Sequence, residues 1–351
     1  MAEKTSPSLK SFFQRNRGLL FSVLVLSLLP FIVGLLEGAS LAQVWVNASG
    51  TSKFVQGLAI EIFILALYAL SYDLVFGITG LLSFGHAMFF ASGAYLTGIL
   101  LKSFDMSLGM ALLWVFVAAI VNALLFGLVL PRVKGITFAL VTLGMASVFH
   151  ILVMSSEMGK YTGADVGLQG VISPEFINPA NERLRFYFIA MVIMFLVYLL
   201  YKRFVSSPTG RVCVAIRENE GRARMLGYNT FYFKLAALTL SSLTAALAGT
   251  LHALYQPIVS PNTASMAYTV TALLVVLIGG VGTLNGALIG AVIYRLLDFG
   301  LRRYLGETAS FINGAIYVAI VLFLPYGIVG TWKLKSLSMR QGWKRLLGMF
   351  K

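Results

Sequence analysis

Charged residues are scarce in this chain: only 11% of its 351 residues are Asp, Glu, Lys or Arg, whereas 58% are hydrophobic. Since about a quarter of the residues of a soluble domain are charged, this composition excludes a soluble globular domain. Crossing a bilayer takes about 20 apolar residues in a helix. Runs of that length without any charge occupy residues 74–101, 107–130, 135–156, 235–294 and 308–332. We therefore predict an all-α, polytopic transmembrane helical bundle.

Cysteine pairs and catalytic motifs are also missing. The single cysteine, Cys213, excludes an intramolecular disulfide. The three histidines lie far apart, and no His-Glu-x-x-His or paired-cysteine spacing that would hold a metal occurs. The Gly-rich run at residues 279–286 lacks the lysine of a phosphate-binding loop. We predict no catalytic, cofactor-binding or metal-binding residue here, so the chain is not expected to be an enzyme.

The formal net charge of +14 is concentrated at the ends of the apolar runs. Because no soluble face gathers these basic residues, we expect contact with membrane lipid and no nucleic-acid partner. Most Lys and Arg fall in an N-tail (residues 1–18), in the turn after Pro131, in an insert (residues 202–234) and in a C-tail (residues 333–351). Cytoplasmic loops are rich in Lys and Arg, which predicts about ten helices between residues 19 and 332 with both termini inside.

Two further segments bear on this topology. Residues 19–36 follow the basic N-tail as the core of a signal peptide would, but they exceed the usual core of about 7 to 15 residues, so we favour an uncleaved first helix. The longest insert on the opposite face, residues 157–183, contains TGADVGLQG. We interpret it as a structured extracytoplasmic surface loop. Arg302 and Arg303 would lie on the outer side, against the positive-inside pattern.

The basic insert carries the signals of a capped helix. Ser207 is a candidate N-cap, Pro208 suits the first helical position, and Gly227 suits the left-handed residue that ends a helix. Apolar residues between them recur imperfectly at helical spacing, so one side can pack while the other pairs with charge. The segment is either a helix that meets a partner or a solvated loop kept inside by its charges.

Glycines and polar residues interrupt the predicted crossing at residues 77–98, which holds five glycines with Thr79, Ser83 and His86. Irregular backbone at membrane depth must be covered by protein or by a water-filled path, so these residues either line a translocation path or allow close packing. Gly286 and Gly290 likewise predict close helix approach. The path candidates are Glu61, Thr79, Ser83, Gly85, His86, Thr283 and Asn285.

Ionisable groups within spans are functional suspects by default, so Glu61, Asp73 and His86 are candidates for a proton relay. Asp73 lies near the inner end of its crossing, where water can reach it, whereas Glu61 lies deeper. We interpret Glu61 as a packing or gating contact in preference to a proton carrier.

Several stretches together resemble the permease subunits of branched-chain amino acid ABC importers of the LivM type. They are SYDLVFGITGLLSFGHAMFFASGAY, GITFALVTLGMA, TGADVGLQG, SPTGRVCVAIRENEGRARMLGYNTFYFKLAA and LLVVLIGGVGTLNGALIGA. Their order and spacing span most of the chain. The family usually has a glycine where Ala164 stands, a departure that affects loop geometry or substrate.

The resemblance implies an inner-membrane heterodimer with a second permease subunit, two cytoplasmic ATPase subunits that bind ATP and Mg, and an extracytoplasmic solute-binding protein. It also implies a short cytoplasmic coupling helix at residues 212–227. The coupling residues carried over are Ala215, Ile216, Arg217, Glu218, Asn219, Arg222, Ala223, Leu226 and Gly227.

Alternatives remain open for the solute and the energy source. Related importers of urea, amides, sugars or nucleosides share the architecture that the resemblance implies. An ion-coupled secondary transporter would also have broken helices and a buried acid such as Glu61, but the large basic insert disfavours it. A channel is the most distant alternative, since no filter motif is apparent.

Overall fold

A computed structural model describes residues 17–38, 40–45, 50–324 and 326–332. Six helices within these ranges are long and apolar enough to cross a membrane, and four shorter apolar helices accompany them. The fold is thus the all-α polytopic bundle that the sequence predicts, and the helix number is close to the expected ten. The predicted C-tail and nearly all of the predicted N-tail lie outside the described residues.

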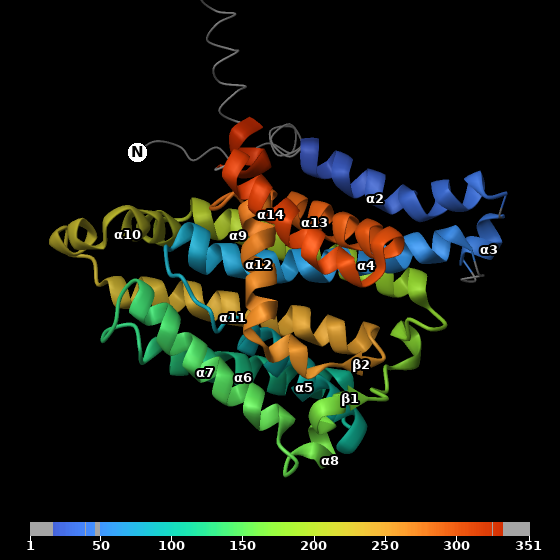
Figure 1. Cartoon of the computed structure of the whole chain (residues 1–351), viewed down its shortest axis with the longest axis horizontal. Helices are drawn as coiled ribbons and strands as arrows, with labels where there is room; N and C mark the ends of the chain where they lie inside the picture. The colour runs from blue at the N-terminus through green and yellow to red at the C-terminus, as the bar shows by residue number, and fades with distance from the viewer. Residues whose placement is uncertain (1–16, 39, 46–49, 325, 333–351) are drawn as a thin grey trace, which may run out of the picture. The chain divides into compact units, whose positions relative to one another are not determined.

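The helices follow the predicted crossings closely (Figure 1). They are α2 (Arg17–Leu36), α3 (Leu41–Trp45), α4 (Thr51–Asp73), the π-helical turn η1 (Leu74–Ile78), α5 (Ala87–Ser103), α6 (Leu108–Gly127), α7 (Ile136–Met154), α8 (Gly159–Thr162), α9 (Arg183–Ser206), α10 (Pro208–Met225), α11 (Thr230–Tyr255), α12 (Met266–Gly279), α13 (Leu284–Leu305) and α14 (Ala309–Phe323). Short 3-10 turns lie at η2 (Ala164–Val166), η3 (Glu175–Ile177), η4 (Pro261–Ala264) and η5 (Gly306–Thr308).

The chain forms two compact units, of which the first comprises Met1–Ile60 and Glu175–Ile189. Side-chain to backbone hydrogen bonds hold its helices together. Tyr187 donates its hydroxyl to the Leu26 carbonyl at 2.6 Å, and Ser52 donates to the Pro30 carbonyl at 2.8 Å. The second bond uses the carbonyl of Pro30 itself, which is the only proline in α2. Lipid is as apolar as the helix surfaces, so apolar contact alone gives little drive for helices to associate in a membrane. Hydrogen bonds from polar side chains therefore help to hold these helices together.

The second unit, Glu61–Pro174 with Ala190–Lys351, has α11 and α5 at its core. The two helices approach so closely that a Cβ on Gly93 would overlap the Ala246 backbone and a Cβ on Gly249 would overlap the Phe90 carbonyl. Thr97 and Thr250 share a hydroxyl hydrogen bond of 2.8 Å across the same contact. Small residues and interhelical hydrogen bonds are the means by which helices associate in membranes.

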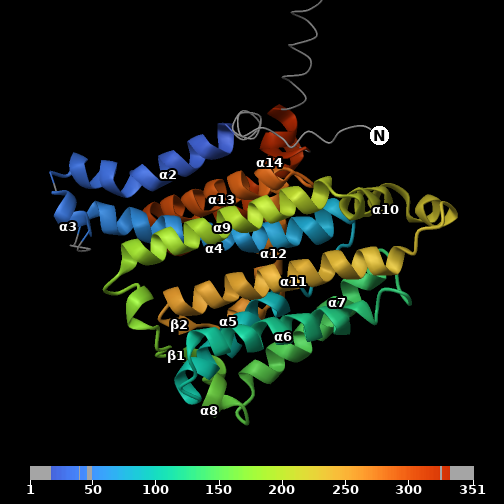
Figure 2. The same cartoon turned by 180° about the vertical axis from the view of Figure 1, so that it is seen from behind.

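The two ends of α11 carry different structures (Figures 1 and 2). Helix α10 lies at the end where α11 begins. At the other end β1 (Leu168–Gln169) pairs antiparallel with β2 (Ile258–Val259), and Tyr95 donates its hydroxyl to the Val259 carbonyl at 3.0 Å. The TGADVGLQG segment, which includes α8's last residue, η2 and β1, is therefore structured, as its sequence predicts.

Ala164 within this segment has a φ of +48°, in the left-handed region. That conformation costs a residue with a Cβ about 1–2 kcal/mol, a penalty that glycine escapes. We expect Ala164→Gly to raise the free energy of unfolding by about 1 kcal/mol, measured as a higher thermal midpoint in detergent. As a control, Ala215→Gly at an exposed helical position should lower it by about as much. Equal destabilisation by both changes would contradict the assigned strain.

The last predicted crossing, residues 308–332, is wrong as a single helix. Helix α14 ends at Phe323, Leu324 has φ −126° and ψ 66°, and a separate helical stretch occupies residues 327–332. The sequence gives the reason, because Pro325 disfavours the helical conformation of the residue before it.

Candidate translocation and coupling site

The polar glycine-rich stretch after α4 is a genuine break in the helix. The π-helical turn η1 ends at Ile78, Gly80 has a φ of +76°, and regular helix resumes only at Ala87. The predicted crossing at residues 77–98 is therefore irregular in its first part. Within the second unit, Thr79, Ser83 and His86 are each at most 1% exposed. Protein covers the break in this conformation, which satisfies the requirement that unpaired backbone be shielded from lipid.

His86 sits among aromatic rings inside this break. Its Nε2 lies 2.9 Å from the Ser71 hydroxyl, and its ring packs edge-on against Tyr72 at a centroid distance of 5.2 Å. Gly85 next to it is a close-packing position, because a Cβ there would overlap the Thr142 carbonyl. Across the described part of the chain, no hydrogen bond or ion pair joins His86 to Glu61 or Asp73. The three candidates of the proton-relay hypothesis thus form no connected path here.

A second break lies between α12 and α13. Gly280 and Gly282 have φ values of +123° and +72°, and Thr283 donates its hydroxyl to the Gly280 carbonyl at 2.6 Å. Close approach of α12 and α13 is confirmed at Gly290, where a Cβ would overlap the Val275 carbonyl oxygen. The exposed Asn285 accepts a hydrogen bond from the Tyr198 hydroxyl.

The two breaks meet at one junction, and Arg217 of α10 lies in it. The Asp73 carboxylate accepts a hydrogen bond of 2.7 Å from the Gly282 backbone N–H, which ties the end of α4 to the second break. The Arg217 guanidinium donates to the Gly77 carbonyl in η1. A Cβ on Gly80 would lie 2.8 Å from Arg217 Cγ, so only glycine leaves room for this side chain. Arg217 therefore connects α10 with both breaks.

Helix α10 has the predicted caps. The Ser207 hydroxyl accepts from the Gly210 N–H at 3.2 Å, Pro208 occupies the first helical position, and Gly227 has a φ of +87°. The prediction of one continuous helix is wrong, however, at Asn219, where the backbone is extended. The Asn219 side chain accepts from the Arg222 N–H at 3.0 Å and so caps a second, shorter helical segment.

The predicted coupling residues divide between two faces of α10. Ile216 and Ala223 are buried with Val212 and pack against Phe233, so they face the second unit itself. The exposed members, which include two residues just beyond the end of α10, are Ala215, Arg217, Glu218, Asn219, Arg222, Leu226 and Gly227. Leu226 is 76% exposed and its neighbour Met225 81%. The helix is thus amphipathic in the way the sequence indicates, and the described residues leave its apolar tip at Met225 and Leu226 uncovered.

Glu220 fixes the shorter segment of α10 to the start of α11. Its Oε1 lies 2.7 Å from the Arg224 guanidinium and 2.8 Å from the buried Lys234 ammonium, and it accepts from the Thr230 hydroxyl at 2.9 Å. Burial alone would raise the pKa of Glu220, but the hydrogen bonds from Lys234, Thr230 and Arg224 outweigh it and lower the pKa to about 2. No sequence pattern had singled out Glu220.

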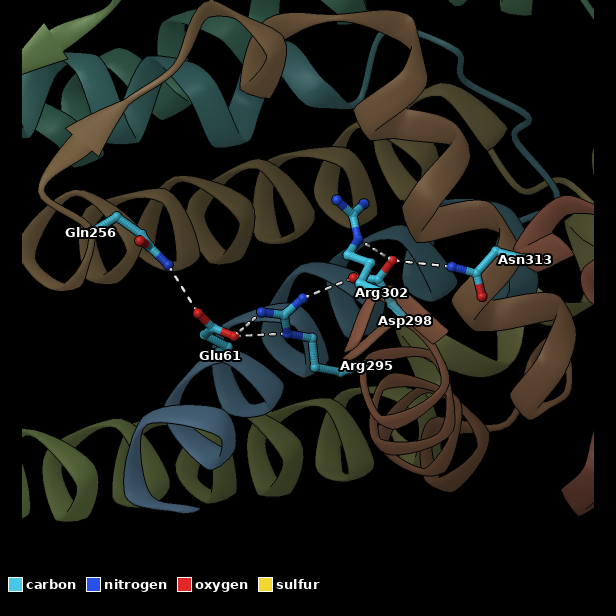
Figure 3. A network of polar contacts seen from close by, with 6 residues as sticks. All are labelled: Glu61, Gln256, Arg295, Asp298, Arg302 and Asn313. Atoms are coloured by element: carbon cyan, nitrogen blue, oxygen red, sulfur yellow. Dashed lines mark hydrogen bonds and ion pairs between the residues drawn. The ribbon is translucent and has the colours of Figure 1, made fainter. Parts of the chain in front are cut away.

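A network of charged side chains joins α4, α13 and α14 (Figure 3). Arg295 Nε lies 2.7 Å from Glu61 Oε2, and Gln256 donates to the other Glu61 oxygen at 3.1 Å. Arg295 Nη1 lies 3.0 Å from Asp298 Oδ2. Asp298 in turn accepts from Arg302 at 2.8 Å and from Asn313 at 3.2 Å. Glu61 is therefore paired, in this conformation, with Arg295 on α13.

Arg295, Asp298 and Asn313 were not predicted as members of this network. Arg295, Asp298 and Arg302 occur at i, i+3 and i+7, which places them on one face of a helix, and that spacing was the available signal. Arg302 pairs with Asp298 at 2.8 Å, but the positive-inside pattern counts Lys and Arg and not net charge, so Arg302 and Arg303 remain exceptions to it.

A multi-pass bundle, two helix breaks of which the first is buried, and an attached amphipathic helix are together the features of a membrane transport subunit. A family model described as the permease component of branched-chain amino acid transport systems matches residues 54–324, and the chain belongs to this family. LivM of Escherichia coli (strain K12), a high-affinity branched-chain amino acid transport system permease protein, is 27% identical over 287 residues, which cover 75% of this chain and 67% of LivM.

Further relatives widen this picture. LivH of Salmonella typhimurium (strain LT2), a permease protein of the same kind of system, is 26% identical over 285 residues, which cover 76% of this chain and 91% of LivH. The probable LivM of Methanocaldococcus jannaschii is 28% identical over 180 residues, which cover 46% of this chain and 52% of that protein. No solved structure matches the chain.

Proposed function

We propose that this chain is the membrane-spanning permease subunit of an ATP-driven importer, energised by separate ATPase subunits and supplied by a solute-binding protein. The observation that carries the proposal is α10, which exposes one face and connects through Arg217 to both helix breaks. A helix with an uncovered amphipathic surface suits docking in a groove of a partner. A displacement of α10 would be transmitted to both helix breaks through the contacts of Arg217.

This arrangement and the family support the proposed partners. Two ATPase subunits bind ATP and Mg, and one of them receives the exposed residues of α10. A cleft of about 350 Å³ beside this surface, lined by Pro131, Glu220, Arg224 and Lys234 among others, offers room for a partner side chain. Similarity to both LivM and LivH supports a second, related permease subunit, with which the chain forms a heterodimer.

Branched-chain amino acids are the proposed solutes, because the relatives' names and the family description agree on that transport system. The test is uptake into proteoliposomes holding the complete complex. Leucine uptake should require ATP and the binding protein and should be indifferent to a protonophore. Gradient-driven uptake by this chain alone would overturn the proposal in favour of a secondary transporter. Uptake of urea, an amide, a sugar or a nucleoside instead of leucine would retain the transport mode and change the solute.

The chain is proposed to lie in the bacterial inner membrane with α10 and both termini cytoplasmic. The placement of α10 and the β1–β2 pair at opposite ends of α11 supports loops on opposite faces (Figure 2). Six Lys or Arg and no acid follow Trp332, so the C-tail should be retained inside. A reporter active only outside the cytoplasm, fused after Lys351, should remain silent. The same reporter inserted after Asp165 is the positive control, and activity at the C-terminus would contradict this topology.

Ser83 tests whether the first break lines the path during transport. Ser83→Cys is nearly isosteric and fully buried at rest, so it should resist hydrophilic thiol reagents until the complete complex turns over ATP, when labelling should rise. Burial raises the pKa of the native Cys213 thiol to about 11, which keeps it unreactive. Ser206→Cys, at an exposed position, provides the reactive control. Inertness of Ser83→Cys throughout turnover would favour the packing interpretation.

A further inference from the structure

The network around Glu61 and Arg295 lies at the middle of its helices. Glu61 is in the middle of α4 (Thr51–Asp73), and Arg295 is in the middle of α13 (Leu284–Leu305). With a rise of 1.5 Å per residue, each lies roughly 15 Å or more from either end of its helix. In spanning helices this depth corresponds to the centre of the hydrocarbon core.

The two side chains are not sealed inside the chain. Arg295 is 29% exposed and Glu61 23% exposed, while Asp298 is 9% exposed. Charged groups at this depth do not face lipid but face a water-filled path or another protein segment. A water-filled path or another protein segment therefore covers the exposed edge of the Glu61–Arg295 pair in the membrane.

We propose that this pair is a binding subsite for the zwitterionic backbone of an α-amino acid; the proposal rests on the proposed import function. The Arg295 guanidinium binds the solute carboxylate in the planar geometry that arginine offers. The Glu61 carboxylate, oriented by Gln256, binds the solute ammonium. One internal ion pair is exchanged for two ion pairs with the solute.

Charge balance selects a zwitterion over a simple ion. Glu61 and Asp298 balance Arg295 and Arg302, so the network is neutral as a unit. An anion bound to Arg295 would leave Glu61 without its partner, and a cation bound to Glu61 would strand Arg295. Stranding one member of an ion pair at membrane depth is costly, whereas a zwitterion supplies both replacements and adds no net charge.

Asp298 keeps the site in place during this exchange. It holds a third bond to Arg295 on the side away from Glu61 and is itself bound by Arg302 and Asn313 (Figure 3). The Asn313 amide oxygen is buried and has no hydrogen-bond partner among the described residues, so the network has an unused acceptor. Because the bond between Arg295 and Asp298 does not involve Glu61, Arg295 remains oriented when Glu61 turns to the solute.

The test uses the complete complex and separates a subsite from a structural clamp. Removing one partner of an ion pair at membrane depth is more disruptive than removing both, so a clamp predicts that E61Q/R295Q is closer to wild type than E61Q alone. A subsite predicts that the double variant assembles normally, yet its leucine uptake per ATP hydrolysed falls about tenfold or more. The matched control is E182Q/R185Q, which removes a partly exposed ion pair. Double-variant uptake within about twofold of the control would overturn the proposal.

A second measurement does not depend on variant folding. Leucine binding to the wild-type complex in nanodiscs, without binding protein, is followed by saturation-transfer NMR. Competition by 4-methyl-2-oxopentanoate, which lacks the ammonium, and by 3-methylbutylamine, which lacks the carboxylate, should each be about tenfold weaker than by leucine. Equal competition by either analogue, or no leucine binding, overturns the subsite. These two outcomes are distinguishable from a failure of the proposed function, because in that case the wild-type complex itself would show no ATP-dependent leucine uptake.

Discussion

Ala215→Pro is expected to abolish solute uptake by the assembled importer. Ala215 is an exposed residue inside the first segment of α10. Proline there removes a backbone hydrogen bond and clashes with the preceding turn, which costs about 3 kcal/mol or more in a helix interior. The exposed face that we assign to the ATPase would lose its shape, while no apolar span is altered. Uptake into proteoliposomes and co-purification of the ATPase subunits measure the effect.

Two comparisons make this result specific to the helix. Ala215→Ser keeps the backbone hydrogen bond and should retain most uptake, since serine is tolerated at exposed helical positions. Arg217→Pro should behave like Ala215→Pro. In both proline variants the second permease subunit should still co-purify, because the spans are intact. An Ala215→Pro complex that transports at half the wild-type rate or better would contradict the docking role of α10.

Arg217→Ala is expected to uncouple ATP hydrolysis from transport. The residue is 34% exposed, and its guanidinium both pairs with Glu218 at 2.7 Å and donates to the Gly77 carbonyl. Its loss leaves the exposed docking residues of α10 in place but removes the link to η1. We expect uptake to fall about tenfold or more while ATP hydrolysis stays within about threefold of wild type, as expected when one charged hydrogen bond is lost. Both rates are measured on the same proteoliposomes.

Arg211→Ala removes an exposed arginine from the same helix and should change neither rate. Arg217→Lys should be intermediate, because an ammonium can donate to the carbonyl but lacks the planar guanidinium. Gly80→Ala should reproduce the Arg217→Ala phenotype from the other side of the contact, since its Cβ would lie 2.8 Å from Arg217 Cγ. Parallel loss of hydrolysis and uptake in Arg217→Ala would contradict a transmitting role.

The sequence was sufficient wherever structure depends on near neighbours along the chain. Apolar runs located the crossings, Ser207 and Gly227 marked the ends of α10, and glycines at residues 77–85 marked the first break. Each of these features follows from local backbone preference or from the length needed to cross lipid. The break at Asn219 was also local, but it was missed because Asn is a capping residue as well as a tolerated helix residue.

The tertiary structure alone decided which polar groups meet. Asp73, Arg217 and Gly282 form one junction although they are separated by up to 209 residues, and Glu61 reaches Arg295 across 234 residues. Periodicity reports only which face of a helix a residue occupies, whereas these pairs depend on how distant helices pack. A buried charge in a membrane needs a partner, so the sequence required that Glu61 have one. Only the packing of α4 against α13 determined that the partner is Arg295, because residues so far apart in sequence are brought together by no local rule.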